Sequence, residues 1–213
     1  MPKGRYRLHD PDDRTPPADE HFQCAPGPTG WRYVSRRTTV TGAPSGSVDL
    51  TLDALGRPVR LELATGHWRV RAAALDGLTW VRMGADGTDA AQRTAEGRGF
   101  SGDSPAFLVA TARLLRLTPA APEARVRLVT FTAPHLAPRT HDQGWTLLGS
   151  EEHPTDSGPL TVVHYRVDDL ETGASGTVHL AGDVVLAAPG VELEALDSPP
   201  SPPADAAGLT PGE

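Results

Sequence analysis

Residues 48–63 decide the fold class, and they read Val-Asp-Leu-Thr-Leu-Asp-Ala-Leu-Gly-Arg-Pro-Val-Arg-Leu-Glu-Leu. Apolar and polar side chains alternate on both sides of a short link, residues 54–57, that contains a glycine. Alternation with a period of two residues is typical of a strand that has one buried face and one face in water. The stretch therefore predicts a β-hairpin within an antiparallel sheet.

The same alternation continues along the chain. Residues 68–71 repeat it, and Asp76-Gly77 is a hairpin turn signal that leads into a strand at 78–81. A strand is also expected around 92–98, in a segment that glycines interrupt. Further strands are predicted at 125–132, 144–151, 160–167, 176–180, 184–187 and 191–195.

One helix is predicted, at residues 104–117. Ser104 is expected as its N-cap and Pro105 as its first helical residue. Phe107, Thr111 and Leu114 recur at helical spacing, and Pro119 stops the helix. The order of strands, one helix and further strands predicts a mainly β (α+β) fold. In it a large curved antiparallel sheet, or half-barrel, wraps one central helix.

The length of 213 residues is typical of one domain, and 22 glycines with 21 prolines suit many short strands and tight turns. Residues 1–29 combine prolines with acidic side chains and are predicted to be a disordered or extended tail. Residues 198–213 are a Pro-rich segment of low complexity and are predicted to be disordered. The single β-rich domain is then expected at 30–197.

Charge and cysteine content exclude several classes of protein. The formal net charge is −7 and the arginines do not form runs, so we expect no nucleic-acid partner. Residues 1–10 are polar, which does not match a secretory signal, and no window has 18 apolar residues in a row. We therefore expect no integral membrane segment and, by elimination, a cytoplasmic location. Cys24 has no partner for an internal disulfide.

Motifs for metal or nucleophile chemistry are absent. His135 and His141 are six residues apart in a loop that contains proline, and no histidine pair has the spacing of metal ligands. We therefore expect no metal and no cofactor. His141-Asp142 is interpreted as part of a loop rather than as a base beside its acid. Ser101 lacks the Gly-x-Ser-x-Gly pattern of a nucleophile elbow, so no hydrolase triad is predicted.

His164, Tyr165 and Arg166 are the first candidates for catalytic residues. They lie in the predicted strand 160–167, where neighbouring side chains point to opposite faces. In one arrangement His164 and Arg166 face the inside of the sheet and place a titratable group and a cation there. In the other, which is the more hydrophobic choice, Tyr165 faces inward between two valines and His164 is exposed.

The aromatic side chains are the candidates for ligand contacts. The tryptophans lie in predicted strands, and an inward tryptophan offers a large contact area at a small entropic cost. Ordinary core packing is the equally weighted alternative. The residues expected to line an apolar cleft are Trp68, Trp80, Phe107 and Trp145.

A family resemblance adds a hypothesis. The order of the hairpin 53–63, the helix 104–117, the paired segments within 126–149 and the closing hairpin 178–190 resembles a bacterial family of domains of unknown function described as glycolipid-binding. That family is similar in fold to lipoprotein-carrier half-barrels. The family usually has Tyr-Pro-Gly after its last strand, whereas this chain has Ala188 before Pro189 and Gly190. The resemblance implies a curved sheet and an apolar cleft.

Two functions follow as hypotheses. In the first, the protein binds an apolar or lipid-like small molecule in a cleft between the curved sheet and the helix. In the second, it is a cofactor-free enzyme of specialised metabolism, such as a cyclase, isomerase or hydrolase, that uses the same pocket. The acid–base groups of that enzyme would be His164, Tyr165 and Arg166.

Overall fold

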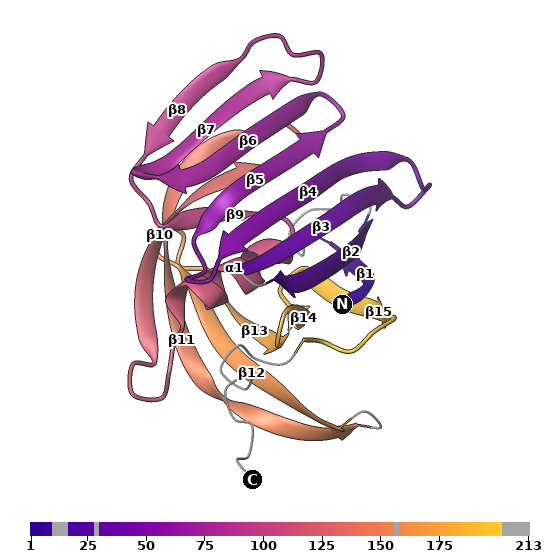
Figure 1. The fold of residues 1–213 in the computed structure, drawn as a ribbon, viewed down its shortest axis with the longest axis vertical. Coiled ribbons are helices and arrows are strands. Elements are labelled where there is room, and N and C mark those ends of the chain that lie inside the picture. The colour runs from indigo at the N-terminus through magenta and orange to yellow at the C-terminus, as the bar shows by residue number, and fades with distance from the viewer. Residues whose placement is uncertain (10–16, 28–29, 156–157, 202–213) are drawn as a thin grey trace.

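The computed structural model describes residues 1–9, 17–27, 30–155 and 158–201, which form one sheet of fifteen strands and one helix (Figure 1). This confirms the prediction of a mainly β protein with one short helix and a large curved sheet. The elements are β1 (Lys3–Leu8), β2 (Ala18–Gly27), β3 (Gly30–Thr39), β4 (Pro44–Asp53), β5 (Pro58–Thr65), β6 (Trp68–Leu75), β7 (Gly77–Gly84), β8 (Ala91–Ala95), β9 (Gly99–Gly102), α1 (Ala106–Leu115), β10 (Glu123–Thr132), β11 (Ala137–Thr155), β12 (Gly158–Asp169), β13 (Ser175–Ala181), β14 (Val184–Ala188) and β15 (Val191–Leu196).

The strand order explains why the sheet curves. Neighbours along the chain pair antiparallel from β1 to β8 and from β10 to β15, while β9 lies parallel to β10. The first strand pairs with the last one, so β1 and β15 join the two halves in the middle of the sheet. Strands β8 and β9 form its two free edges, yet only residues 96–98 separate them. Because so short a link cannot cross a flat sheet, the sheet bends until the end of β8 lies near the start of β9.

Side-chain packing also brings strands β7 and β10 together. The ring of Trp80 on β7 meets Phe131 on β10 edge to face, with 6.0 Å between the ring centroids. Leu128 and Val129 are consecutive, point to opposite faces and are both fully buried. At these two residues strand β10 is therefore covered on both faces.

Helix α1 packs between the β4–β5 turn and strand β9, as Figure 1 shows. At Gly56, in that turn, an added Cβ atom would lie 2.5 Å from the carbonyl oxygen of Arg113. At Gly99 an added Cβ atom would lie 3.3 Å from the side chain of Leu114. The helix residues that this packing buries are Ala106, Phe107, Val109, Ala110, Thr111 and Leu114.

The helix is shorter than the predicted span 104–117. Pro105 rather than Ser104 is the N-cap residue, so that part of the prediction is wrong. The Ser104 hydroxyl accepts the Ala106 N–H at 3.3 Å and donates to the buried Glu20 carboxylate at 2.6 Å. The helix ends at Leu115 because the next residue adopts a left-handed conformation with φ of 49°.

The prediction that residues 1–29 form a tail is wrong for the described part of that segment. Residues 3–8 and 18–27 are strands β1 and β2. The rings of Tyr6 and Phe22 are buried and stack with 4.5 Å between their centroids. These strands gain their apolar burial from partners far along the chain, which local composition does not reveal. Residues 10–16 and 28–29 of the predicted tail lie outside the described residues.

At the other end of the chain, the described residues 198–201 follow β15 without further strand, and Ser201 N–H donates to the Asp183 carboxylate at 2.8 Å. The rest of the predicted Pro-rich tail, 202–213, lies outside the described residues. Strand β11 is much longer than its predicted span 144–151, and strand β9 was not predicted. No helix in the described part of the chain is long and apolar enough to cross a membrane.

Candidate functional site

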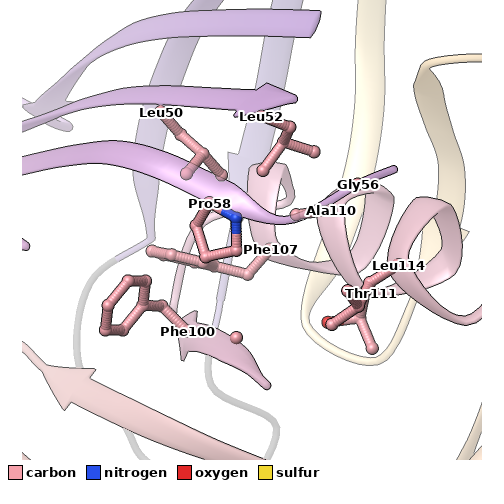
Figure 2. A pocket seen from close by; sticks show the side chains of 10 residues that line it. Leu50, Leu52, Gly56, Pro58, Phe100, Phe107, Ala110, Thr111 and Leu114 are labelled. Atoms are coloured by element: carbon pink, nitrogen blue, oxygen red, sulfur yellow. The ribbon is translucent and has the colours of Figure 1, made fainter. Parts of the chain in front are cut away.

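Phe107 is a lining residue of two cavities beside the helix. Phe107 is the second residue of the helix, and its ring faces strands β4 and β5 (Figure 2). Of the four predicted ligand-contact residues, Phe107 alone lines either cavity.

The first cavity is apolar. Its walls come from β4, the turn after it, β9 and α1, and its lining residues include Leu50, Leu52, Phe100 and Leu114 (Figure 2). The atom-free space, which is partly open to solvent, is about 240 Å³. The cavity has room for about one water molecule.

The second cavity has both polar and apolar lining residues. Ser35, Arg37 and Ser45 are polar, and Leu63 and Leu136 are apolar. Its atom-free space, also partly open to solvent, is about 410 Å³, with room for about three water molecules. A cavity of this composition matches a small ligand that has both a polar and an apolar part.

A fully buried carboxylate, Glu20, is one of the polar residues that line this cavity. Its oxygens accept hydrogen bonds from Tyr33 Oη at 2.9 Å, from Ser104 Oγ at 2.6 Å and from Arg37 Nη2 at 3.2 Å. Burial, followed by the nearby Glu20 charge, raises the pKa of Tyr33, so its phenol stays protonated and donates. The carboxylate thus ties strands β2 and β3 to the start of α1.

Two hydroxyl groups in this cavity have no partner in the described part of the chain. They are the buried Oγ atoms of Ser35 and Ser45. A buried hydroxyl without a hydrogen bond costs about 1–3 kcal/mol, so water or a ligand is its natural partner. The cavity therefore offers unused hydrogen-bonding groups beside apolar walls.

The predicted catalytic residues do not converge on one surface. Tyr165 is buried and meets Trp145 edge to face, with centroids 5.6 Å apart, as in the more hydrophobic of the two predicted arrangements. His164 points to the opposite face, where its Nδ1 lies 2.7 Å from Nδ1 of His179. Arg166 shares that face, is exposed and donates to Asp168 and Thr146. The tyrosine is thus separated from the other two side chains by the sheet.

The predicted tryptophans also lie apart from one another. Trp68 is partly buried beneath the Arg82 guanidinium, whose central carbon is 3.3 Å from the ring centroid. Trp80 packs on Phe131, and the indole N–H of Trp145 donates to Gln143 at 3.0 Å. These three rings belong to core packing in this structure. Among the described residues, no group of three histidine, cysteine or acidic side chains could hold a metal ion.

Sequence reasoning missed Glu20, Ser35 and Arg37 as site residues. Glu20 falls inside the segment interpreted as a tail, and the other two lie on a strand with little apolar alternation at its end. One local signal was present, because Glu20, Phe22 and Cys24 alternate with polar residues. That alternation places Glu20 on the buried face and marks it as a carboxylate that needs internal donors.

Comparisons with known proteins bear on the fold. No family model matches the chain, and no curated protein matches it. A DUF1089 family protein from Pseudomonas aeruginosa, solved as a crystal structure, is 18% identical, with a TM-score of 0.51 over 89% of this chain and 91% of that one. A β-barrel-like protein of domain of unknown function DUF1849 from Brucella abortus is 14% identical, with a TM-score of 0.43 over 92% and 95% of the two chains. The likeness to the DUF1089 protein shows that this chain shares its curved β fold.

Proposed function

We propose that this protein binds a lipid-like small molecule with a neutral, hydroxyl-bearing head in the cleft between the curved sheet and α1. The observation that carries the proposal is that Phe107 lines both an apolar cavity and a mixed cavity in which two hydroxyls lack a partner among the described residues. The hydroxyls of Ser35 and Ser45 would bind the head, and the apolar part would lie along Phe107 and Leu63.

The charges around the mixed cavity favour a neutral head. Glu20 and Asp103 are both acidic, while Arg37 is the basic side chain among the lining residues and already contacts Glu20 at 3.2 Å and Asp103 at 3.9 Å. A carboxylate ligand would add a further negative charge in a region of low dielectric and would be repelled. A sugar or glycerol hydroxyl can donate to the acidic groups and accept from the serines without that cost.

Binding in this proposal requires Phe107 to move. The two cavities together hold only a few water molecules, so an alkyl chain needs the space that the phenyl ring occupies. A rotation of that ring would join the cavities into one cleft along α1. The alternative, a cofactor-free enzyme built on His164, Tyr165 and Arg166, has less support because these side chains lie on two faces of the sheet.

The test is binding of three short-chain amphiphiles below their micellar concentrations, measured by native mass spectrometry and by calorimetry. Octyl glucoside should bind, whereas octanoate and octyltrimethylammonium should bind at least about tenfold more weakly if the head group decides affinity. Loss of one hydroxyl in Ser35→Ala should weaken octyl glucoside binding about two- to tenfold.

Two further variants complete the design. Phe107→Trp, which fills the space that the chain needs, should abolish binding, and the exposed Ser150→Ala serves as the matched control for Ser35→Ala. Equal binding of all three amphiphiles, or binding that is unchanged in both site variants, would reject the proposed cleft.

A further inference from the structure

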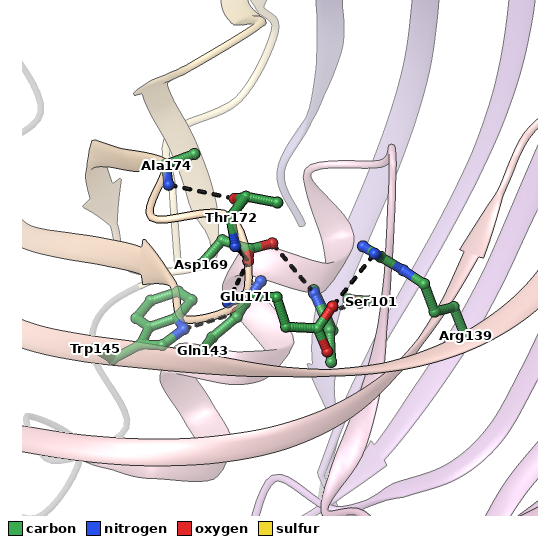
Figure 3. Close-up of polar contacts among 9 residues, drawn as sticks. Ser101, Arg139, Gln143, Trp145, Asp169, Glu171, Thr172 and Ala174 are labelled. Carbon is green, nitrogen blue, oxygen red and sulfur yellow. Dashed lines mark hydrogen bonds and ion pairs between the residues drawn. The ribbon is translucent and has the colours of Figure 1, made fainter.

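A serine, a histidine and an aspartate meet on one face of strands β9 to β12, outside the proposed ligand cleft. Ser101 Oγ lies 2.9 Å from Nε2 of His141, and Nδ1 of His141 lies 3.6 Å from Oδ2 of Asp169. Figure 3 shows Ser101 and Asp169 with the turn that follows β12. Ser101 and His141 are 40 residues apart in the sequence, so no short sequence motif predicts their contact.

The sheet register explains how these residues meet. Ser101 pairs with Thr130 on β10, and His141 pairs with Leu128 on the same strand. The side chains of Ser101 and His141 therefore reach over β10 toward each other. Asp169 is the last residue of β12 and pairs with Gln143 on β11, two residues after His141.

The carboxylate of Asp169 is held in place and ionised. Its Oδ1 accepts the backbone N–H groups of Glu171 and Thr172, both at 2.9 Å (Figure 3). The Thr172 contact is the largest of the causes that lower the pKa of Asp169, and His141 contributes as well. The second oxygen, Oδ2, is thus free to face the imidazole.

The tautomer of His141 follows from its surroundings. Nδ1 is buried and has no hydrogen-bond partner in the described part of the chain, and the Asp169 carboxylate is the anion that faces it. A negative charge beside Nδ1 favours the proton on that nitrogen, which leaves Nε2 as an acceptor for the Ser101 hydroxyl. This is the order of acid, base and nucleophile in serine hydrolases, with the acid–base contact still longer than a hydrogen bond.

We propose that Ser101, His141 and Asp169 form a hydrolytic site for small neutral esters. Ser101 Oγ attacks the ester carbonyl and forms a C–O bond while its proton passes to His141 Nε2. The bond to the alkoxy group then breaks, and that oxygen leaves as an alcohol with the proton from Nε2. A water molecule hydrolyses the acyl-serine by the same route and restores the hydroxyl.

The surroundings define the substrate class. Ser101 is 8% exposed and His141 is 7% exposed, so only a short acyl group can reach Oγ. Within the described part of the chain, Asp169 forms no ion pair with an arginine or lysine, and Glu171 beside it is paired with Arg139 at 3.3 Å. The negative charge of Asp169, which no arginine or lysine of the described residues pairs, disfavours anionic esters. This inference does not rest on the proposed amphiphile site, so either can fail alone.

The test uses an alkyl fluorophosphonate, which labels activated serines, with the labelled residue located by peptide mass spectrometry. Ser101 should react at least about 100-fold faster than the exposed Ser150, since general-base assistance contributes about 10²–10⁴-fold. Ser101→Ala should lose the label and the hydrolysis of 4-nitrophenyl acetate, while Ser150→Ala should keep both. A folded wild-type protein without label at Ser101 would overturn the proposal.

Asp169→Asn tests the positioning residue, because the amide oxygen can still accept the turn N–H groups while the charge is removed. Labelling should slow at least about tenfold, and the acid limb of its pH profile should move to lower pH because the imidazolium loses its anion. A purely structural role would leave that limb in place. Ser101→Cys provides a second readout, since His141 should make the introduced thiol far more reactive toward iodoacetamide than the buried Cys24, whose pKa is raised mainly by burial.

Discussion

The buried carboxylate of Glu20 on β2 connects the neighbouring strand β3 with Ser104 before α1, 84 residues further along the chain. Tyr33, Arg37 and Ser104 all direct hydrogen-bond donors to it, and its side chain is almost fully shielded from solvent. A buried charge is tolerated only where such donors surround it, so this group is sensitive to the loss of any member.

Glu20→Ala should lower the free energy of unfolding by about 3 kcal/mol, because it leaves the Arg37 charge and two hydroxyls without their acceptor. Glu20→Gln should cost less, since the amide oxygen can still accept from Tyr33 and Ser104. Urea unfolding followed by tryptophan fluorescence measures both changes. A loss below about 1 kcal/mol for Glu20→Ala would show that the three donors find other partners in the folded protein.

The contact between α1 and the β4–β5 turn depends on a single residue, Gly56. Gly56 has a φ of 78°, which favours glycine, and its Cα faces the backbone of Arg113. Gly42, in the β3–β4 turn, has a similar φ of 81° but nothing within 4 Å of an added Cβ atom. The two glycines thus share the backbone requirement and differ in their surroundings.

Gly42→Ala should destabilise the protein by about 1 kcal/mol, the cost of a left-handed alanine. Gly56→Ala carries that cost and also pushes the turn away from the helix, so it should lose at least about 2 kcal/mol more. Thermal unfolding of both variants under identical conditions gives the difference. Equal losses would mean that α1 does not pack against this turn.

The elements that could be predicted from the sequence are those whose own residues show a strong apolar periodicity. The hairpin at 48–63 and the helix around Phe107 carry their own periodicity, so β4, β5 and α1 could be predicted. Strands β1 and β2 could not, because the partners that bury Tyr6 and Phe22 come from β15 and β3. The contact of Ser101 with His141 is equally invisible, since it depends on the register of β10 between them.

Strand β1 joins the two halves of the curved sheet, because it pairs with β2 on one side and with β15 on the other. Tyr6 is the centre of this join: its ring is buried, it stacks on Phe22, and its hydroxyl accepts the Val185 N–H at 3.0 Å. The join makes the sheet one continuous hydrogen-bonded unit, so we expect the two halves to unfold together.

Tyr6→Ala should therefore lower the free energy of unfolding by about 3–5 kcal/mol, as large aromatic truncations do. The strands on both sides of β1 should be destabilised. Hydrogen exchange followed by mass spectrometry can locate the effect. Peptides from β4–β6 and from β11–β13 should lose protection by similar factors, while the exposed Val59→Ala should leave both unchanged. If only the strands next to β1 lost protection, the halves would be separate cooperative units, and the curvature of the sheet would depend on the contact of β7 with β10 rather than on β1.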